Sequence, residues 1–151
     1  MFTLLHHPFC PQSRFIRLIL GEHGLDVRPV EERVWERREA FLKLNPAGTT
    51  PVLIADGIPA VPGAAIIADY LDETYGERVG ERRLLPTSMP ERIEVRRLLA
   101  WFNEKFFEEV SGPLVTERIY KRFMAEEIGG GPPETDVMRD ARTNVRYHLA
   151  Y

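Results

Sequence analysis

The 151-residue sequence contains a single cysteine, Cys10. One thiol cannot form an internal disulfide, and proteins without disulfides are typical of a reducing compartment. The four histidines also lack the spacing of metal ligands, apart from one adjacent pair. We therefore predict a cytoplasmic protein with no disulfide framework and no bound metal.

A strong excess of one charge and long apolar runs are also absent. The net charge is −3, and acidic and basic residues are interspersed, so nucleic acid is not an expected partner. No apolar stretch approaches the roughly 20 residues that cross a bilayer, and the N-terminus lacks the cationic start of a signal peptide. With 44% apolar and 28% charged residues, the composition is that of a globular domain with no membrane insertion.

The first 76 residues carry the pattern of a small mixed α/β domain. A β run in "FTLLHH" precedes helical spacing in "PQSRFIRLILGEHG", and a second β run lies in "LDVRPVEE". A short helix in "ERREAFLKLN" ends at Asn45-Pro46, because proline cannot continue it. "PVLIADGIPAV" predicts a hairpin about Asp56-Gly57, and a helix follows in "GAAIIADYLDETYG". The predicted order is therefore βαβ, then α, then ββα.

The rest of the sequence is predicted to be helical. Residues 77–88 are polar and are interpreted as a linker, and "SMPE" has the spacing of a helix-starting capping box. The helix that follows carries an apolar stripe, interpreted as core, and Gly112-Pro113 should break or bend it. The stripe consists of Val95, Leu98, Leu99, Phe102, Phe106 and Val110. Two or three helices cannot enclose it, so residues 89–151 are expected to be the first part of a larger helical domain.

Cys10 is the first candidate for chemistry. It follows a predicted strand and begins a helix, where unpaired N–H groups and the helix dipole favour a thiolate. The Cys-Pro-x-Ser spacing places Ser13 one turn from the sulfur, where a hydroxyl is positioned to donate to a thiolate. Serine in place of a second cysteine leaves only monothiol chemistry. The alternative, that a lone cysteine is a small buried apolar side chain, stays open.

The segment "NPAGTTPVLI" is the second candidate. A proline directly before a β run, preceded by a turn, suits a cis Thr50-Pro51 bond, although trans is the more frequent form. A cis bond would leave the Thr50 backbone facing outward, able to pair with an extended peptide as an added strand. The sequence leaves both isomers open.

These motifs together resemble the glutathione S-transferase superfamily. The strand, the Cys-Pro-x-Ser helix start, "LNPAGTTPVL", the hairpin and "AIIADYLDETYG" resemble its thioredoxin-like domain. The resemblance implies an α/β thioredoxin-like N-terminal domain over residues 1–76. After the linker, an all-α C-terminal domain, apparently incomplete, begins at residue 89. It also implies that Cys10, with Ser13 nearby, is the catalytic sulfur of a cysteine-type member, and that Thr50 and Pro51 contact glutathione.

One position departs from the family pattern. Members usually carry Glu-Ser before the third helix, and those side chains hold the γ-glutamyl end of glutathione; the matching residues here are Pro62 and Gly63. The N–H groups of Gly63 and Ala64 remain as expected donors to a carboxylate. Losing two side-chain bonds to charged groups lowers affinity by about a hundredfold or more. We therefore expect glutathione to bind weakly at most.

The chain is also similar to one branch of this superfamily. "VEERVWERREAFLKLNPAGTTPVL" and "RIEVRRLLAWFNEKFFEEV" resemble the alphaproteobacterial division regulators that bind FtsZ filaments. This resemblance implies a homodimeric scaffold with weak or no glutathione conjugation. The alternative is an active cysteine-type transferase or monothiol reductase, conjugating or deglutathionylating small electrophiles. Trp35 is the candidate partner-binding residue, since aromatic side chains amid arginines form interaction hot spots; otherwise it packs the second helix onto the sheet.

Overall fold

The computed structural model describes residues 1–150, which form two compact units, Met1–Leu98 and the residues from Leu99 onward. The first unit contains a sheet with helices on its faces, and the second is helical. This arrangement is the predicted fold class, a thioredoxin-like α/β region followed by a helical region. The division at a 77–88 linker stays a prediction.

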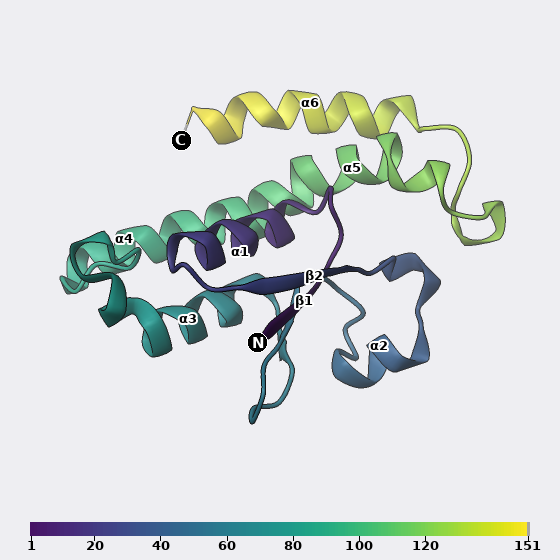
Figure 1. Cartoon of the computed structure of the whole chain (residues 1–151). Coiled ribbons are helices and arrows are strands. Elements are labelled where there is room, and N and C mark those ends of the chain that lie inside the picture. Colours follow the sequence, from purple (N-terminus) through teal and green to yellow (C-terminus); the bar gives the residue numbers. More distant parts are fainter. Residues whose placement is uncertain (151) are drawn as a thin grey trace. The chain divides into compact units, whose positions relative to one another are not determined.

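The sheet has the strand order β2-β1-β3-β4, and its neighbouring strands β1 and β2 are labelled in Figure 1. Its strands are β1 (Phe2–His6), β2 (Val27–Glu31), β3 (Val52–Ile54) and β4 (Val61–Pro62). β1 and β2 are parallel and are joined through helix α1 (Pro11–Glu22), whereas β3 is antiparallel to both β1 and β4. The predicted βαβ unit is confirmed, and so is the hairpin, whose connection of residues 55–60 turns at Asp56-Gly57.

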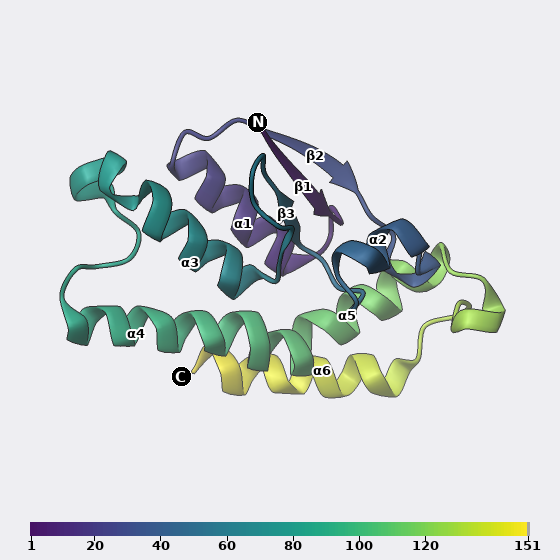
Figure 2. The same ribbon diagram turned by 90° about the horizontal axis from the view of Figure 1, so that it is seen from below.

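Alternation along the strands builds a core on each face of the sheet. Leu4 and Leu53 pack with α1 and with α3 (Ala64–Tyr75). The neighbouring Leu5 and Val52 pack with Phe41 of α2 (Glu39–Leu44) on the other face. Successive side chains of a strand point to opposite faces, so adjacent leucines serve both layers. Figure 2 shows α1 and α3 side by side, with the strands between them and α2.

Asp72 of α3 forms ion pairs with two arginines from the segments that follow this helix. Its carboxylate is 3% exposed and accepts two hydrogen bonds from Arg83, at 3.0 and 2.7 Å. Nη2 of Arg92 lies 3.2 Å from the same carboxylate. Arg83 follows the 3-10 segment η2 (Gly76–Arg82), and Arg92 lies in α4 (Met89–Ala100). One buried acid therefore connects three elements of the first unit.

The close approach of Gly76 to this ion pair gives a first prediction. A Cβ on Gly76 would lie 2.8 Å from Oδ1 of Asp72 and 2.9 Å from Nε of Arg83. Gly76→Ala should therefore lower the free energy of unfolding by about 1–3 kcal/mol, measured by urea denaturation. Gly21→Ala in α1 is the matched control, because its Cβ would meet nothing within 4 Å. The control should gain about 0.5–1 kcal/mol, and equal effects of the two changes would contradict the steric argument.

The second unit continues the α4 helix through unusually wide turns. Two π-helical segments, η3 (Trp101–Lys105) and η4 (Phe107–Ser111), lead into α5 (Gly112–Arg118). Short 3-10 segments, η5 (Tyr120–Arg122) and η6 (Glu126–Ile128), precede α6 (Thr135–Leu149).

The predicted disturbance of the helix near Gly112-Pro113 is seen as the π-helical turns that directly precede them. Proline lacks an N–H and crowds the carbonyl four residues earlier, here that of Glu109. In the structure the Gly112 N–H bonds the Phe107 carbonyl, and Nδ2 of Asn144 in α6 donates to the Glu109 carbonyl at 3.3 Å. A side chain thus replaces the backbone donor that proline removes.

The predicted apolar core stripe is confirmed only in part, because two of its six residues are exposed. Val110 is buried, but Phe102 is 46% exposed and Leu98 is 37% exposed. The buried centre of this unit also includes His148, whose ring lies against Trp101 and the stripe residue Phe106 and whose Nε2 is 2.8 Å from Glu109. Periodicity identified an apolar face, but it did not show how much of that face other elements of the described chain cover.

Candidate functional site

Cys10 is the N-cap residue of α1, as its sequence position predicted. Its backbone is extended, its carbonyl accepts the Arg14 N–H at 3.0 Å, and its sulfur accepts the Ser13 N–H at 3.4 Å. A side chain that accepts from the third helical amide is the usual capping arrangement. The sulfur therefore satisfies one of the N–H groups left free at the helix start.

The expected contact from the Ser13 hydroxyl is not made. Ser13 contacts the sulfur through its backbone amide, and its Oγ is buried without a hydrogen-bond partner among residues 1–150. The physical reason is the cap geometry, which points the third amide of the helix, not the third side chain, at the capping atom. Ser13 thus positions Cys10 through its main chain.

The Cys10 thiol is closed off on its other side by the loop before β3. Cys10 is 5% exposed, and its Sγ lies 3.8 Å from the Thr50 carbonyl, to which it donates. The Thr50-Pro51 bond is cis, the form that suited the sequence. Asn45 holds the loop, because its Nδ2 donates to the Thr49 carbonyl at 2.8 Å.

This burial makes the reactivity of the thiol testable. Native protein should react with Ellman's reagent at least about tenfold more slowly than protein unfolded in guanidinium, because a buried, hydrogen-bonded cysteine is protected from attack. The single cysteine makes the signal unambiguous. Equal native and unfolded rates would show that the sulfur opens readily, and would favour the enzyme interpretation.

The corner at Pro62, Gly63 and Ala64 joins β4 to α3. Gly63 precedes the helix with φ +87°, and Ala64 is its first residue. The expectation that the N–H groups of both Gly63 and Ala64 are free for a carboxylate is wrong for Gly63. Its N–H donates to the Pro51 carbonyl at 2.9 Å, because that bond ties the corner to the cis-proline loop. The corner therefore offers a γ-glutamyl group less than the sequence predicted.

Trp35 lies in the 3-10 segment η1 (Val34–Glu36), and it is half-buried. Its ring makes an edge contact with His7, with centroids 5.3 Å apart. His7 in turn lies 6.1 Å from the ring of Phe9, which is 53% exposed and directly precedes Cys10. The aromatic residues Trp35, His7 and Phe9 thus form one cluster beside the thiol, a grouping that joins residues far apart in the sequence.

His7 is the buried member of this cluster. Burial lowers the pKa of its imidazole; nearby Glu31 opposes that shift and Arg33 adds to it. The ring is therefore neutral over most of the physiological pH range, and its Nδ1 accepts the Phe9 N–H at 3.4 Å. The sequence did not single out His7 or Phe9, since a lone exposed aromatic carries no pattern.

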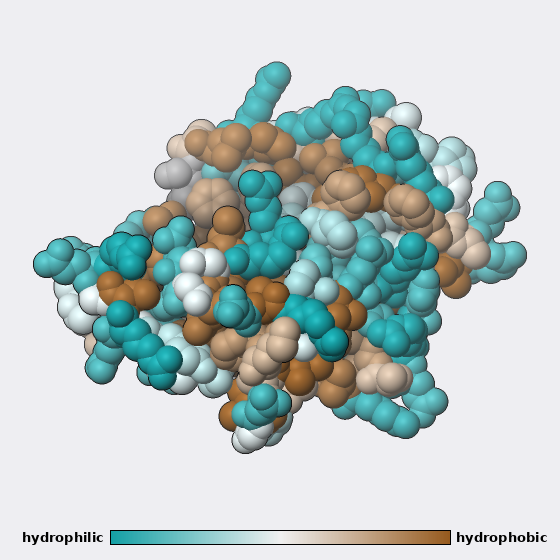
Figure 3. Space-filling model, in the orientation of Figure 1, coloured by the Kyte–Doolittle hydropathy of each residue, from teal (hydrophilic) through white to brown (hydrophobic). Residues whose placement is uncertain are grey.

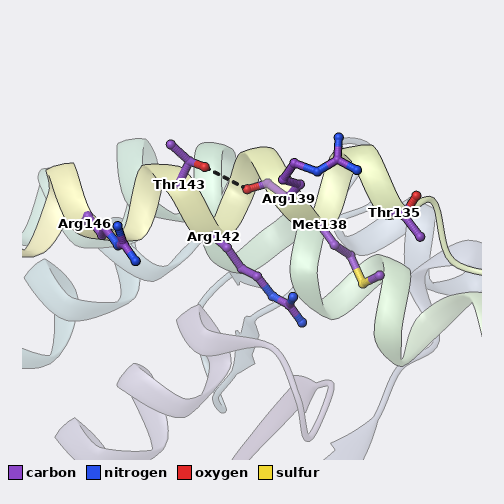
Figure 4. Close-up of a pocket in the computed structure, with 6 residues that line it drawn as sticks. All are labelled: Thr135, Met138, Arg139, Arg142, Thr143 and Arg146. Carbon is purple, nitrogen blue, oxygen red and sulfur yellow. Dashed lines mark hydrogen bonds between the residues drawn. The ribbon is translucent and has the colours of Figure 1, made fainter.

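Other surfaces of the described chain do not match the predicted sites. A hollow runs along α6 and is lined by Thr135, Met138, Arg139, Arg142, Thr143 and Arg146 (Figure 4). It lies along one helix, and none of the predicted site residues lines it. Apolar side chains reach the surface in several separate patches on the face shown in Figure 3.

Residues 1–150 offer neither a metal site nor a membrane-spanning helix. His, Cys, Asp and Glu side chains form no group of three or more that could hold a metal ion there. None of the described helices combines the length and apolar character that spanning a membrane requires.

Comparison with known proteins establishes the family. The family model described as "Glutathione S-transferase, N-terminal domain" matches residues 4–79. The chain therefore belongs to the glutathione S-transferase family.

Three relatives are more specific. A crystal structure of a glutathione S-transferase from Sinorhizobium meliloti 1021 is 49% identical, with a TM-score of 0.96, over 100% of this chain and 65% of that one. FtsZ-localized protein A of Caulobacter vibrioides is 37% identical over 99% of this chain and 63% of its own length. The structure of FzlA from C. crescentus, also 37% identical, matches 99% of this chain and 64% of that one with a TM-score of 0.84. The chain thus spans less than two thirds of the length of these relatives.

Proposed function

We propose that this protein is a glutathione S-transferase-fold scaffold that binds FtsZ filaments in the cytoplasm and has weak or no glutathione-conjugating activity. The observation that carries the proposal is the closed thiol site. Cys10 is covered by the Thr50 carbonyl, and the Gly63 N–H is already bonded to Pro51. The similarity to FtsZ-localized protein A supports FtsZ as the partner.

The closed site argues against the transferase alternative. A thiol that attacks an electrophile must present its sulfur to the substrate as a thiolate. The Cys10 side chain is instead only 5% exposed, and its sulfur lies 3.8 Å from the Thr50 carbonyl. Pro62 and Gly63 also lack the side chains that hold the γ-glutamyl group in most members of the family, which supports weak glutathione binding.

We propose Trp35 as a residue that contacts the filament. Its ring is only half-buried, and it makes an edge contact with the buried ring of His7. A large aromatic side chain held at low conformational cost is a common centre of protein interfaces.

Homodimerisation is a further part of the proposal. Ile66 of α3 and Ile93 of α4 are both exposed, at 58% and 60%. The same two helices are joined by an ion pair between Arg96 and Asp69, at 3.0 Å. These exposed isoleucines on two connected helices support an interface with a second copy of the chain, as the family is generally dimeric.

Two binding measurements test the function. Purified protein should sediment with polymerised FtsZ and should pass through glutathione-agarose with little retention. Firm retention together with conjugating activity would overturn the scaffold interpretation. Failure to sediment with FtsZ filaments would remove the partner assignment, whatever the result on glutathione.

A further inference from the structure

We infer that the surface formed by Phe9, Trp35 and Arg37 binds an acidic segment of a protein partner, with Arg37 receiving a carboxylate. The inference rests on the proposed function, in which Trp35 contacts FtsZ, and adds the chemistry of what is recognised. We call these three residues the Phe9–Arg37 surface.

The three residues of the first unit are connected through shared neighbours. Phe9 and Trp35 both lie against the ring of His7. Arg37 follows Trp35 by two residues, and a Cβ on Gly48 would lie 3.6 Å from its Nη1, so the guanidinium lies against the loop that leads to Thr50. That loop in turn covers Cys10, the residue after Phe9.

The charges around this surface leave Arg37 as the unpaired group. Arg33 pairs with Glu31 and Glu36, at 3.4 and 3.5 Å. Buried Glu32 pairs with Arg38. The three acids of residues 31–38 are thus engaged, whereas Arg37 is exposed and has no ion-pair or hydrogen-bond partner for its side chain among residues 1–150. An exposed guanidinium beside aromatic rings suits a carboxylate flanked by apolar groups.

The backbone of Arg37 provides a second, independent observation. Its φ is +45°, which makes it the non-glycine residue with positive φ among those described. Glycine or asparagine adopts this left-handed conformation more readily than arginine. The Arg37 N–H holds this conformation as the C-cap of η1, by donating to the Val34 carbonyl at 3.3 Å, while its side chain stays available for a partner.

The left-handed backbone of Arg37 allows binding and stability to be measured separately, because a purely structural residue would change both together. Arg37→Asn removes the charge while suiting the left-handed backbone, so the urea midpoint should stay the same or rise. Binding should weaken at the same time. Arg37→Lys keeps the charge, and Arg28→Asn is the matched control, because Arg28 is also exposed and unpaired among residues 1–150 but lies on β2.

The probes are two fluorescein-labelled peptides, one alternating glutamate with leucine and one alternating lysine with leucine, measured by fluorescence anisotropy on the full chain. The acidic peptide should bind and the basic one should not. Arg37→Asn should weaken acidic-peptide binding by about tenfold, Arg37→Lys by less than about threefold, and Arg28→Asn by less than about twofold. Equal binding of the two peptides, no binding of the acidic one, or equal effects of Arg37→Asn and Arg28→Asn would overturn the inference.

The same variants in FtsZ sedimentation separate this inference from the proposed function. If the wild type sediments with FtsZ and Arg37→Asn does so equally well, the inference fails while the function stands. If the wild type does not sediment but binds the acidic peptide through Arg37, FtsZ is excluded and the acidic-segment site is supported.

Discussion

Asp72→Ala is expected to lower the free energy of unfolding by about 3 kcal/mol, the lower end of the range for breaking a buried ion pair. The reason is that two arginines lose their shared carboxylate. Their side chains are 20% and 24% exposed, so water can reach part of each guanidinium and limits the loss. Urea denaturation at neutral pH measures the effect.

Asp69→Ala is the matched control for this prediction. Asp69 lies on the same helix and pairs with Arg96, but both side chains are about half exposed. An exposed pair contributes at most about 1 kcal/mol, so the control should change stability little. If both variants lost a similar free energy of unfolding, the burial of Asp72 would not make its ion pairs more stabilising than the exposed pair of Asp69.

The Asp72 pair also predicts a dependence on pH. Burial alone raises the pKa of the Asp72 carboxyl, but the hydrogen bonds and charge of Arg83, with Arg92 adding to them, outweigh burial and hold the pKa below its ordinary 3.8. A lowered folded-state pKa gives stability that is present above the unfolded pKa and is lost as pH falls through the folded one. The stability difference between the wild type and Asp72→Asn should therefore shrink below pH 3.8 and stay constant near neutrality.

Trp35→Ala is expected to weaken binding to FtsZ filaments by about tenfold or more, the loss typical of a central aromatic contact. The ring lies on His7 and its outer part is accessible, so its removal takes away contact area without opening the main core. Co-sedimentation across a range of protein concentrations measures the apparent Kd.

Phe123→Ala provides the comparison for Trp35. Phe123 is 59% exposed and lies in the second unit, outside the Phe9–Arg37 surface. It should leave binding to FtsZ unchanged, and circular dichroism should show that both variants are folded. If Phe123→Ala weakened binding as much as Trp35→Ala, the interface would have to be sought elsewhere.

Local patterns predicted the first unit well. Alternation in "FTLLHH" and the helical spacing after Cys10 gave the βαβ order, because these signals depend only on neighbouring residues. The proline before β3 suggested the cis bond but did not decide it, since the isomer depends on how the loop packs against Cys10.

The site itself was only partly predictable. The N-cap position of Cys10 follows from the sequence, but its cover by Thr50 joins residues 40 positions apart. The contact between His7, which follows β1, and Trp35 of η1 joins residues 28 positions apart, and neither local segment predicts it. Arg37 could not be singled out among its charged neighbours, because its left-handed backbone and its lack of a partner are properties of the folded chain.

The wide turns before Pro113 link two distant positions. Asn144 completes the backbone bonding that the proline ring interrupts, by donating to the carbonyl of Glu109. A substitution that returned an N–H to position 113 would make the Asn144 amide dispensable. Loss of the Asn144 amide alone would leave the Glu109 carbonyl without this donor. Proline and asparagine should therefore be exchanged together when variants of this unit are engineered.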